Sequence, residues 1–289
     1  MKLRNGSFEK SVSKRIIVDT TPVHNALHFL FLCATIWVAK RAVRVVPTLP
    51  ELGKFEADQV RKNIPFGVNG LVVVSIGLVP TLIISFWIIN DISAAANGLF
   101  AMALKVGTVY LGALSTAAGG YYFPTLASAQ NADEFDGCIN ETLKLYLFII
   151  APSAVFLMAG GDILMAVLFT REFIPAAALL LLMLPADIFR ITTENLRLAM
   201  VVKKRLVLSS VIYLAWAVLY VTLALYWLRD FGIMGAALAY LISHIASFVV
   251  MMVVARLALS YRMSRDCKAA LLIAIGLVGS AAAILGMSS

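Results

Sequence analysis

Four charged residues of alternating sign lie within one otherwise apolar stretch of the sequence. They are spaced 3, 4 and 3 residues apart and are Asp187, Arg190, Glu194 and Arg197. This spacing places all four on one face of a helix, where each can pair with an oppositely charged neighbour. One interpretation is a self-neutralising row that is buried against other helices. The other is that Arg190, oriented by its carboxylate neighbours, offers its guanidinium group to a phosphate.

Lys105 is the second candidate for binding chemistry. It lies near the centre of a stretch, 94–117, that holds no other charged residue. If this stretch crosses a bilayer, a cation at its centre costs at least about 2.5 kcal/mol on insertion scales. We therefore expect Lys105 either to face an interior cavity or to form an ion pair, for which Asp162 and Asp187 are candidates.

Residue patterns for other kinds of site are missing from the sequence. His24 and His28 are four residues apart, but the Glu of a zinc protease motif does not lie between them. The chain also has no Gly-rich phosphate loop with a following lysine and no plausible Ser, His and Asp arrangement. The sequence therefore predicts no metal site, no ATP site and no enzyme activity.

The elements that must hold these residues are long and apolar. The chain has 289 residues, of which 61% are hydrophobic and 14% are charged, whereas soluble proteins have about 45 to 50% and about 25%. About 20 apolar residues cross a bilayer as a helix. Uncharged stretches of at least 21 residues occur at 63–90, 206–228, 231–255 and 269–289. Because these runs are continuous and do not alternate, they predict an all-α polytopic membrane protein and exclude a barrel.

We expect a bundle of about seven to eight transmembrane helices in three parts. Residues 1–60 form a basic N-terminal segment, in which an apolar stretch at 23–39 is short enough to be interfacial or re-entrant. The topology of residues 1–46 stays open. Residues 61–260 form a lobe of six helices, and an additional helix follows at 269–287. The six helices of the lobe are expected at 66–90, 94–117, 142–170, 173–198, 206–228 and 232–255.

The basic residues are distributed unequally between the two sides of the predicted membrane. Under simple alternation of the helices, fourteen lie on one side, and only Arg171 and Arg229 lie in the opposite turns. The first side is therefore cytoplasmic by the positive-inside rule. Arg197 lies near that end of its helix and could reach the interface by snorkelling. Because the charges are scattered over short loops, nucleic-acid binding is not expected.

Four stretches of the sequence resemble a known family when they are taken in order. They are Phe123–Ala127, Leu168–Ala177, Arg197–Arg205 and Gly232–Ala239. Their order and their spacing relative to the helices resemble the polysaccharide (O-antigen type) flippases of the multidrug/oligosaccharidyl-lipid/polysaccharide exporter superfamily. The resemblance covers about residues 60–260 and corresponds to the C-terminal lobe of a two-lobed transporter.

The resemblance implies a function in lipopolysaccharide or exopolysaccharide biosynthesis. A protein of this family moves undecaprenyl-pyrophosphate-linked oligosaccharide across the bacterial inner membrane by alternating access, often coupled to Na⁺ or H⁺. The expected pyrophosphate or cavity contacts are Lys105, Arg190 and Arg197. The expected orienting or ion-pair partners are Asp187, Glu194 and Asp162. Because the family's cavity lies between two lobes, the chain is expected to need a second lobe or a homodimer.

Three other interpretations remain open at this point. A multidrug or cation antiporter of the same superfamily would favour acidic cavity residues over basic ones. A membrane-embedded polysaccharide polymerase would need a polar loop, for which the acidic residues Asp133, Glu134 and Asp136 are the only candidate. An inactive, truncated flippase would show neither activity.

Overall fold

The structure is a computed structural model that describes the backbone of residues 57–288. The predicted membrane segment at 23–39 and most of the basic N-terminal segment lie outside the described residues. The chain divides into the units Met1–Lys62 and Asn63–Ser289. The packing described below is that of the second unit. The predicted three-part division at residues 60 and 260 stays a prediction.

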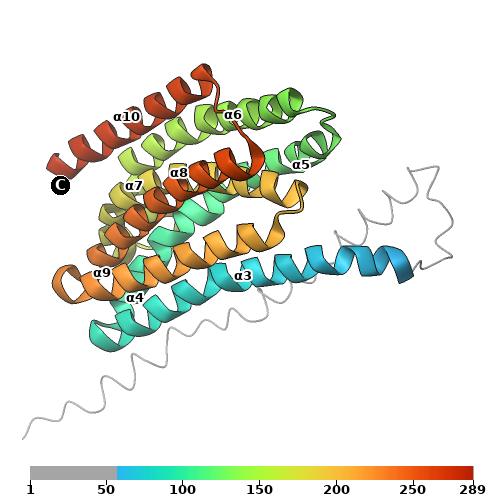
Figure 1. Ribbon diagram of the computed structural model, residues 1–289. Coiled ribbons are helices and arrows are strands. Elements are labelled where there is room, and N and C mark those ends of the chain that lie inside the picture. The colour runs from blue at the N-terminus through green and yellow to red at the C-terminus, as the bar shows by residue number, and fades with distance from the viewer. Residues whose placement is uncertain (1–56, 289) are drawn as a thin grey trace, which may run out of the picture. The chain divides into compact units, whose positions relative to one another are not determined.

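Every regular element of residues 57–288 is helical (Figure 1). The α-helices are α3 (Ala57–Asp91), α4 (Ala94–Lys105), α5 (Gly112–Ser128), α6 (Ala132–Ala159), α7 (Gly161–Leu168), α8 (Ala177–Val202), α9 (Leu206–Leu259) and α10 (Arg265–Ser288). A π-helix, η1 (Val106–Leu111), joins α4 to α5, and a 3₁₀-helix, η2 (Arg171–Ala176), precedes α8. Six helices in this part of the chain are long and apolar enough to cross a membrane. The prediction of an all-α, multi-pass membrane protein is therefore confirmed.

The helix α9 is a hairpin of two membrane crossings. Its 54 residues would extend about 80 Å as one straight helix, far more than a hydrocarbon core of about 30 Å. The chain reverses at Gly232, whose φ of 58° and ψ of −143° are not helical. Aromatic contacts between Tyr220 and Tyr240 and between Trp216 and His244 hold the two halves side by side. The predicted crossings at 206–228 and 232–255 correspond to these two halves.

The helix α8 lies at the centre of the unit and is the most buried of the six described candidate spans. It contacts both α9 and α6, and it also contacts α10 and the segments α4, η1 and α5. Along its length Leu180, Met183, Leu184 and Ile188 are buried in the main apolar core. Large apolar side chains elsewhere face outward, as expected where lipid replaces water as the solvent. Of the charged row of α8, Asp187 is therefore buried inside the bundle.

One loop and one helix differ from the sequence-based expectation. The helices predicted at 94–117 and 142–170 leave a long loop at 118–141, but α5 runs to Ser128 and α6 starts at Ala132. The helices extend because Leu126 of α5 is buried with Ile139 of α6 in a second apolar cluster. In addition, Asn131 caps α6 by accepting a hydrogen bond from the backbone N–H of Glu134 at 2.9 Å. The predicted helix at 142–170 corresponds to α6 and α7, which are separated at Gly160.

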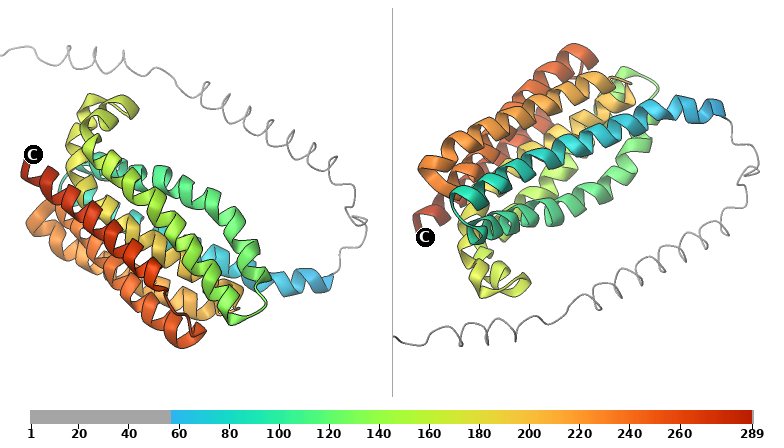
Figure 2. Two further views of the ribbon diagram at one scale, coloured as in Figure 1. Left: turned by 90° about the horizontal axis from the view of Figure 1, so that it is seen from above. Right: turned by 90° about the horizontal axis from the view of Figure 1, so that it is seen from below.

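The helix α10 is anchored to α6 through one buried amide and lies along α6 in Figure 2. The Asn140 side-chain oxygen accepts hydrogen bonds from the Tyr261 hydroxyl at 3.0 Å and from the Ser264 backbone N–H at 2.9 Å. Its nitrogen donates to the Arg262 carbonyl at 3.1 Å and to the Asp136 carbonyl at 2.8 Å. Burial raises the pKa of Tyr261, so its hydroxyl stays protonated and donating. The segment before α10 is thereby fixed to the start of α6.

Candidate functional site

The centre of the site is a buried ion pair on α8. The Arg190 Nε atom lies 2.6 Å from Asp187 Oδ1, three residues earlier on the same helix face. The Tyr240 hydroxyl, from the second half of α9, donates to the same oxygen at 2.9 Å. The Asp187 side chain is only 1% exposed, whereas that of Arg190 is 21% exposed. The carboxylate is thus enclosed, while part of the Arg190 side chain reaches the surface of the unit.

The π-helix η1 approaches this pair very closely at Gly107. A Cβ atom at this position would overlap with Asp187 Oδ2, so a residue without a side chain is required there. The Arg190 Nη2 atom lies 3.5 Å from the Gly107 carbonyl oxygen, at the limit of a hydrogen bond. Single π-helical turns inside longer helices frequently occur at functional sites. Here the turn brings backbone from the α4–α5 stretch against the buried carboxylate.

The second half of the charged row also pairs internally. The Arg197 Nη2 atom lies 2.7 Å from Glu194 Oε2, and its guanidinium carbon lies 6.0 Å from the centre of the Tyr213 ring. The row therefore forms two ion pairs, Asp187 with Arg190 and Glu194 with Arg197. Together the four side chains carry no net charge.

A groove of about 700 Å³ lies between η1, α5, α6 and α8, and we call it the polar groove. Its polar lining residues are Thr108, Tyr146, Arg190, Glu194 and Asn195. The Asn195 side chain is 1% exposed, and neither its nitrogen nor its oxygen has a hydrogen-bond partner among the described residues. Two of the predicted site residues, Arg190 and Glu194, therefore line this groove, and Arg197 is not among its lining residues. The sequence interpretation missed the other three polar residues, although an Asn inside an apolar helix is itself a signal.

Lys105 lies at the junction between α4 and η1, one helical turn before Thr108 of the groove. Its side chain is exposed on the described unit. The ion pairs found within the described residues do not include it: Asp187 pairs with Arg190, and Asp162 lies at the exposed start of α7. Asp162 lines a separate pocket of about 340 Å³ with Pro175 and Leu285. The structure therefore pairs neither candidate carboxylate with Lys105.

An aromatic cluster on α9 includes Tyr240, which donates to the buried Asp187 carboxylate. Tyr240 and His244 lie with their ring centres 4.4 Å apart, and the tilted rings of Trp216 and His244 have their centres 4.9 Å apart. The His244 side chain is buried, and its Nε2 atom has no hydrogen-bond partner among the described residues. Its packing is that of a residue at a helix contact.

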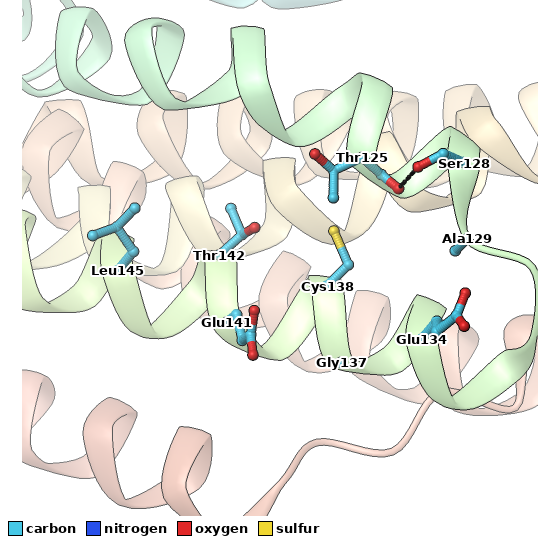
Figure 3. Close-up of a pocket in the computed structure, with 9 residues that line it drawn as sticks. All are labelled: Thr125, Ser128, Ala129, Glu134, Gly137, Cys138, Glu141, Thr142 and Leu145. Carbon is cyan, nitrogen blue, oxygen red and sulfur yellow. Dashed lines mark hydrogen bonds between the residues drawn. The ribbon is translucent and has the colours of Figure 1, made fainter.

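Another pocket, of about 690 Å³, lies between α5 and α6 at the end of the unit where these helices are joined (Figure 3). Thr125 and Ser128 of α5 lie on one wall, and Cys138 of α6 lies on the other. Glu134 also lines it, but its oxygens accept hydrogen bonds from the Gln130 backbone N–H at 2.8 Å and from Asn131 Nδ2 at 2.9 Å. This arrangement caps α6 and fixes the preceding turn.

The remaining acidic residues of this region are also accounted for without catalysis. Asp136 Oδ2 accepts a hydrogen bond from the Arg262 backbone N–H at 3.0 Å, which ties α6 to the segment before α10. Asp133 lies in the first turn of α6, where negative charge is favourable. Within residues 57–288, no group of three or more His, Cys, Asp or Glu side chains is placed to hold a metal ion. These acidic residues thus cap α6 and anchor the segment before α10.

Comparison with known proteins agrees with the fold and with the resemblance noted in the sequence. The family described as "Polysaccharide biosynthesis protein" matches residues 26–178, more than half of the chain. No curated protein matches the chain. Among solved structures, the outward-facing conformation of a multidrug resistance MATE family transporter of the MOP superfamily is similar, with a TM-score of 0.57 and 16% sequence identity.

This structural similarity covers 75% of the present chain and 52% of the solved transporter, so the chain spans about half the length of that protein. At this level of identity the similarity shows the fold alone. The family match adds the sequence relationship that the fold cannot provide. The chain therefore belongs to the polysaccharide biosynthesis protein family, and its fold is similar to that of about half of the solved MATE family transporter.

Proposed function

We propose that the chain acts in a flippase that moves undecaprenyl-pyrophosphate-linked oligosaccharide across the bacterial inner membrane during O-antigen or exopolysaccharide biosynthesis. The observation that carries this proposal is the polar groove, in which Arg190 and Asn195 lie among helices long enough to cross a membrane. A polar groove at this depth is expensive in lipid and is therefore expected to serve a substrate. Membership of a polysaccharide biosynthesis family supports a saccharide-bearing substrate.

The charged residues receive different roles in this proposal. Arg190 donates a hydrogen bond from its Nε atom to Asp187, and its terminal nitrogens can donate to oxygen atoms of a ligand in the groove. Lys105, exposed one turn away, provides a compact positive charge for the pyrophosphate. Arg197 is held by Glu194 and Tyr213, so we assign it the role of fixing Glu194 at the groove. Asp162 receives no role.

Alternating access requires a second group of helices against which the groove opens and closes. The chain spans about half the length of the transporter with the similar fold, which supports the need for a second lobe. Coupling of the movement to Na⁺ or H⁺ belongs to the same proposal. The protein is not proposed to be an enzyme, because the described acidic residues 134 and 136 serve as helix caps and loop anchors.

Gene deletion in the protein's own host tests this function with any partner present. We expect deletion to abolish surface polysaccharide and to accumulate the lipid-linked oligosaccharide in the membrane, and a plasmid copy to restore export. The variant Arg190→Ala should fail to restore it at equal protein level. The variant Thr222→Ala is the matched control, because Thr222 is exposed on α9 and its hydroxyl donates to the Val218 carbonyl of its own helix.

Unchanged surface polysaccharide in the deletion strain would contradict the proposal. Loss of efflux of cationic dyes without any change in polysaccharide would instead identify a multidrug antiporter. The same deletion strain therefore distinguishes a flippase from a multidrug antiporter, the second candidate within the superfamily.

A further inference from the structure

The charge balance of the polar groove argues against binding of a pyrophosphate there. Arg190 is compensated by Asp187 at 2.6 Å, and Arg197 is compensated by Glu194 at 2.7 Å. A multiply charged anion that approached Arg190 would also approach both carboxylates, and their repulsion would offset the attraction. The described polar side chains of the groove thus form a surface of hydrogen-bond donors and acceptors without excess charge.

Asn195 indicates which kind of ligand this surface suits. Its amide is 1% exposed and is unpaired on both the donating and the accepting atom, which lowers the stability of the ligand-free protein. An amide donates and accepts at once, and saccharide hydroxyl and acetamido groups do the same. Both atoms are buried in the ligand-free protein, so a ligand carrying such groups would satisfy them once the Asn195 side chain turns toward the groove.

The other groove residues provide complementary hydrogen-bonding capacity. Arg190 retains terminal N–H groups as donors, and Glu194 pairs with Arg197 through Oε2, leaving Oε1 as an acceptor. Thr108 donates to the Leu104 carbonyl at 2.8 Å and keeps its oxygen as an acceptor. Phe123 lines the same groove and offers an apolar surface to the C–H face of a sugar ring. The volume of about 700 Å³ is within the usual range for small-molecule sites.

We propose that the polar groove binds the uncharged saccharide part of the lipid-linked substrate, with Asn195 as a residue that determines specificity for it. The pyrophosphate of the same molecule lies outside the groove, at Lys105, which has no ion-pair partner among the described residues. This inference rests on the proposed function and divides its substrate between two places. It predicts that the two parts of the ligand depend on different residues.

Two lipid probes separate these contributions in the full-length protein reconstituted in lipid nanodiscs. One is undecaprenyl pyrophosphate, and the other is the same lipid carrying one N-acetylglucosamine. The wild-type protein should bind the sugar-bearing lipid more tightly than the sugar-free lipid. Asn195→Leu should weaken binding of the sugar-bearing lipid about three- to tenfold, the effect of losing one or two hydrogen bonds. It should leave the affinity for the sugar-free lipid unchanged.

Lys105→Met should weaken binding of both lipids by a similar factor, because both carry the pyrophosphate. The matched control is Asn97→Leu, since the Asn97 side-chain oxygen in α4 is also buried without a hydrogen-bond partner among the described residues but does not line the polar groove. It should change neither affinity. The division of the substrate is overturned if Asn195→Leu weakens both lipids equally, or if the wild type shows no preference for the sugar-bearing lipid.

Thermal unfolding of the ligand-free variant supplies a second measurement. Asn195→Leu removes two unsatisfied polar atoms at nearly constant volume, so its Tm should rise by about 2 °C or more. A fall in Tm would show that the amide is structural and would overturn the proposal. Binding of neither lipid by the wild type would instead refute the proposed function itself, which distinguishes the two failures.

Discussion

Gly107 and Asp187 come from different helices, yet a Cβ atom at residue 107 would occupy the space of Asp187 Oδ2. The π-helical turn η1 brings the backbone to this carboxylate, while Arg190 and Tyr240 hold the other oxygen. Three segments therefore meet at one buried side chain. Stability and groove geometry both depend on this contact.

We expect Gly107→Ala to destabilise the protein by about 1 to 3 kcal/mol, the range for overpacking of a well-packed site. The added methyl group displaces the Asp187 carboxylate and disturbs its ion pair. Gly112→Ala is the control, because a Cβ atom there has no neighbour within 4 Å. Thermal unfolding in detergent checks both variants, and equal Tm values for the two would contradict the close approach.

The two ion pairs of α8 should differ in their contribution to stability. Asp187→Asn leaves Arg190 with an uncompensated charge in the bundle, which should cost about 3 to 5 kcal/mol. Glu194→Gln should cost less than about 1 kcal/mol, because Glu194 is 33% exposed. The double variant Asp187→Asn/Arg190→Gln should recover much of the loss, and a double-mutant cycle measures the coupling. Strict additivity would show that the two side chains do not interact.

The hairpin of α9 should depend on Gly235, where a Cβ atom would overlap with the Trp227 backbone carbonyl. We expect Gly235→Ala to cost at least about 2 kcal/mol, since backbone must move to relieve the overlap. A Cβ atom at Gly279 in α10 would have no neighbour within 4 Å. We therefore expect Gly279→Ala to be neutral or stabilising, because Ala favours helix. A comparison of Tm and expression level tests this, and normal folding of Gly235→Ala would argue against the tight turn.

Removal of the Asn140 side chain should release the start of α10. Asn140→Ala leaves the Tyr261 hydroxyl and the Ser264 N–H without their acceptor, for a loss of about 2 to 4 kcal/mol. Tyr261→Phe removes one of these bonds and should cost about 1 kcal/mol. Hydrogen exchange should accelerate at residues 260–270 in the first variant and much less in the second. Uniform acceleration along the whole chain would instead indicate global destabilisation.

Several features of this protein are predictable from the sequence by itself. Long uncharged stretches such as 206–228 and 231–255 require helices, because lipid cannot satisfy backbone hydrogen bonds. The spacing of Asp187 and Arg190 places them on one helix face, and the structure pairs them there. The predicted family resemblance is also confirmed by the family match over residues 26–178, which include two of the four short stretches, together with the similar fold of the solved transporter. These properties are local or compositional, so they can be read along the chain.

The tertiary structure alone decided how the helices meet. Hydropathy does not show that Gly107 lies against Asp187, that Tyr240 bonds to that carboxylate, or that Asn195 is buried without a partner. The tertiary structure also placed the end of α5 at Ser128 instead of near residue 117, because buried contacts with α6 extend the helix beyond the apolar stretch. Such contacts depend on which faces of distant segments pack together. Sequence spacing determines the face on which a residue lies, whereas packing determines what that face touches.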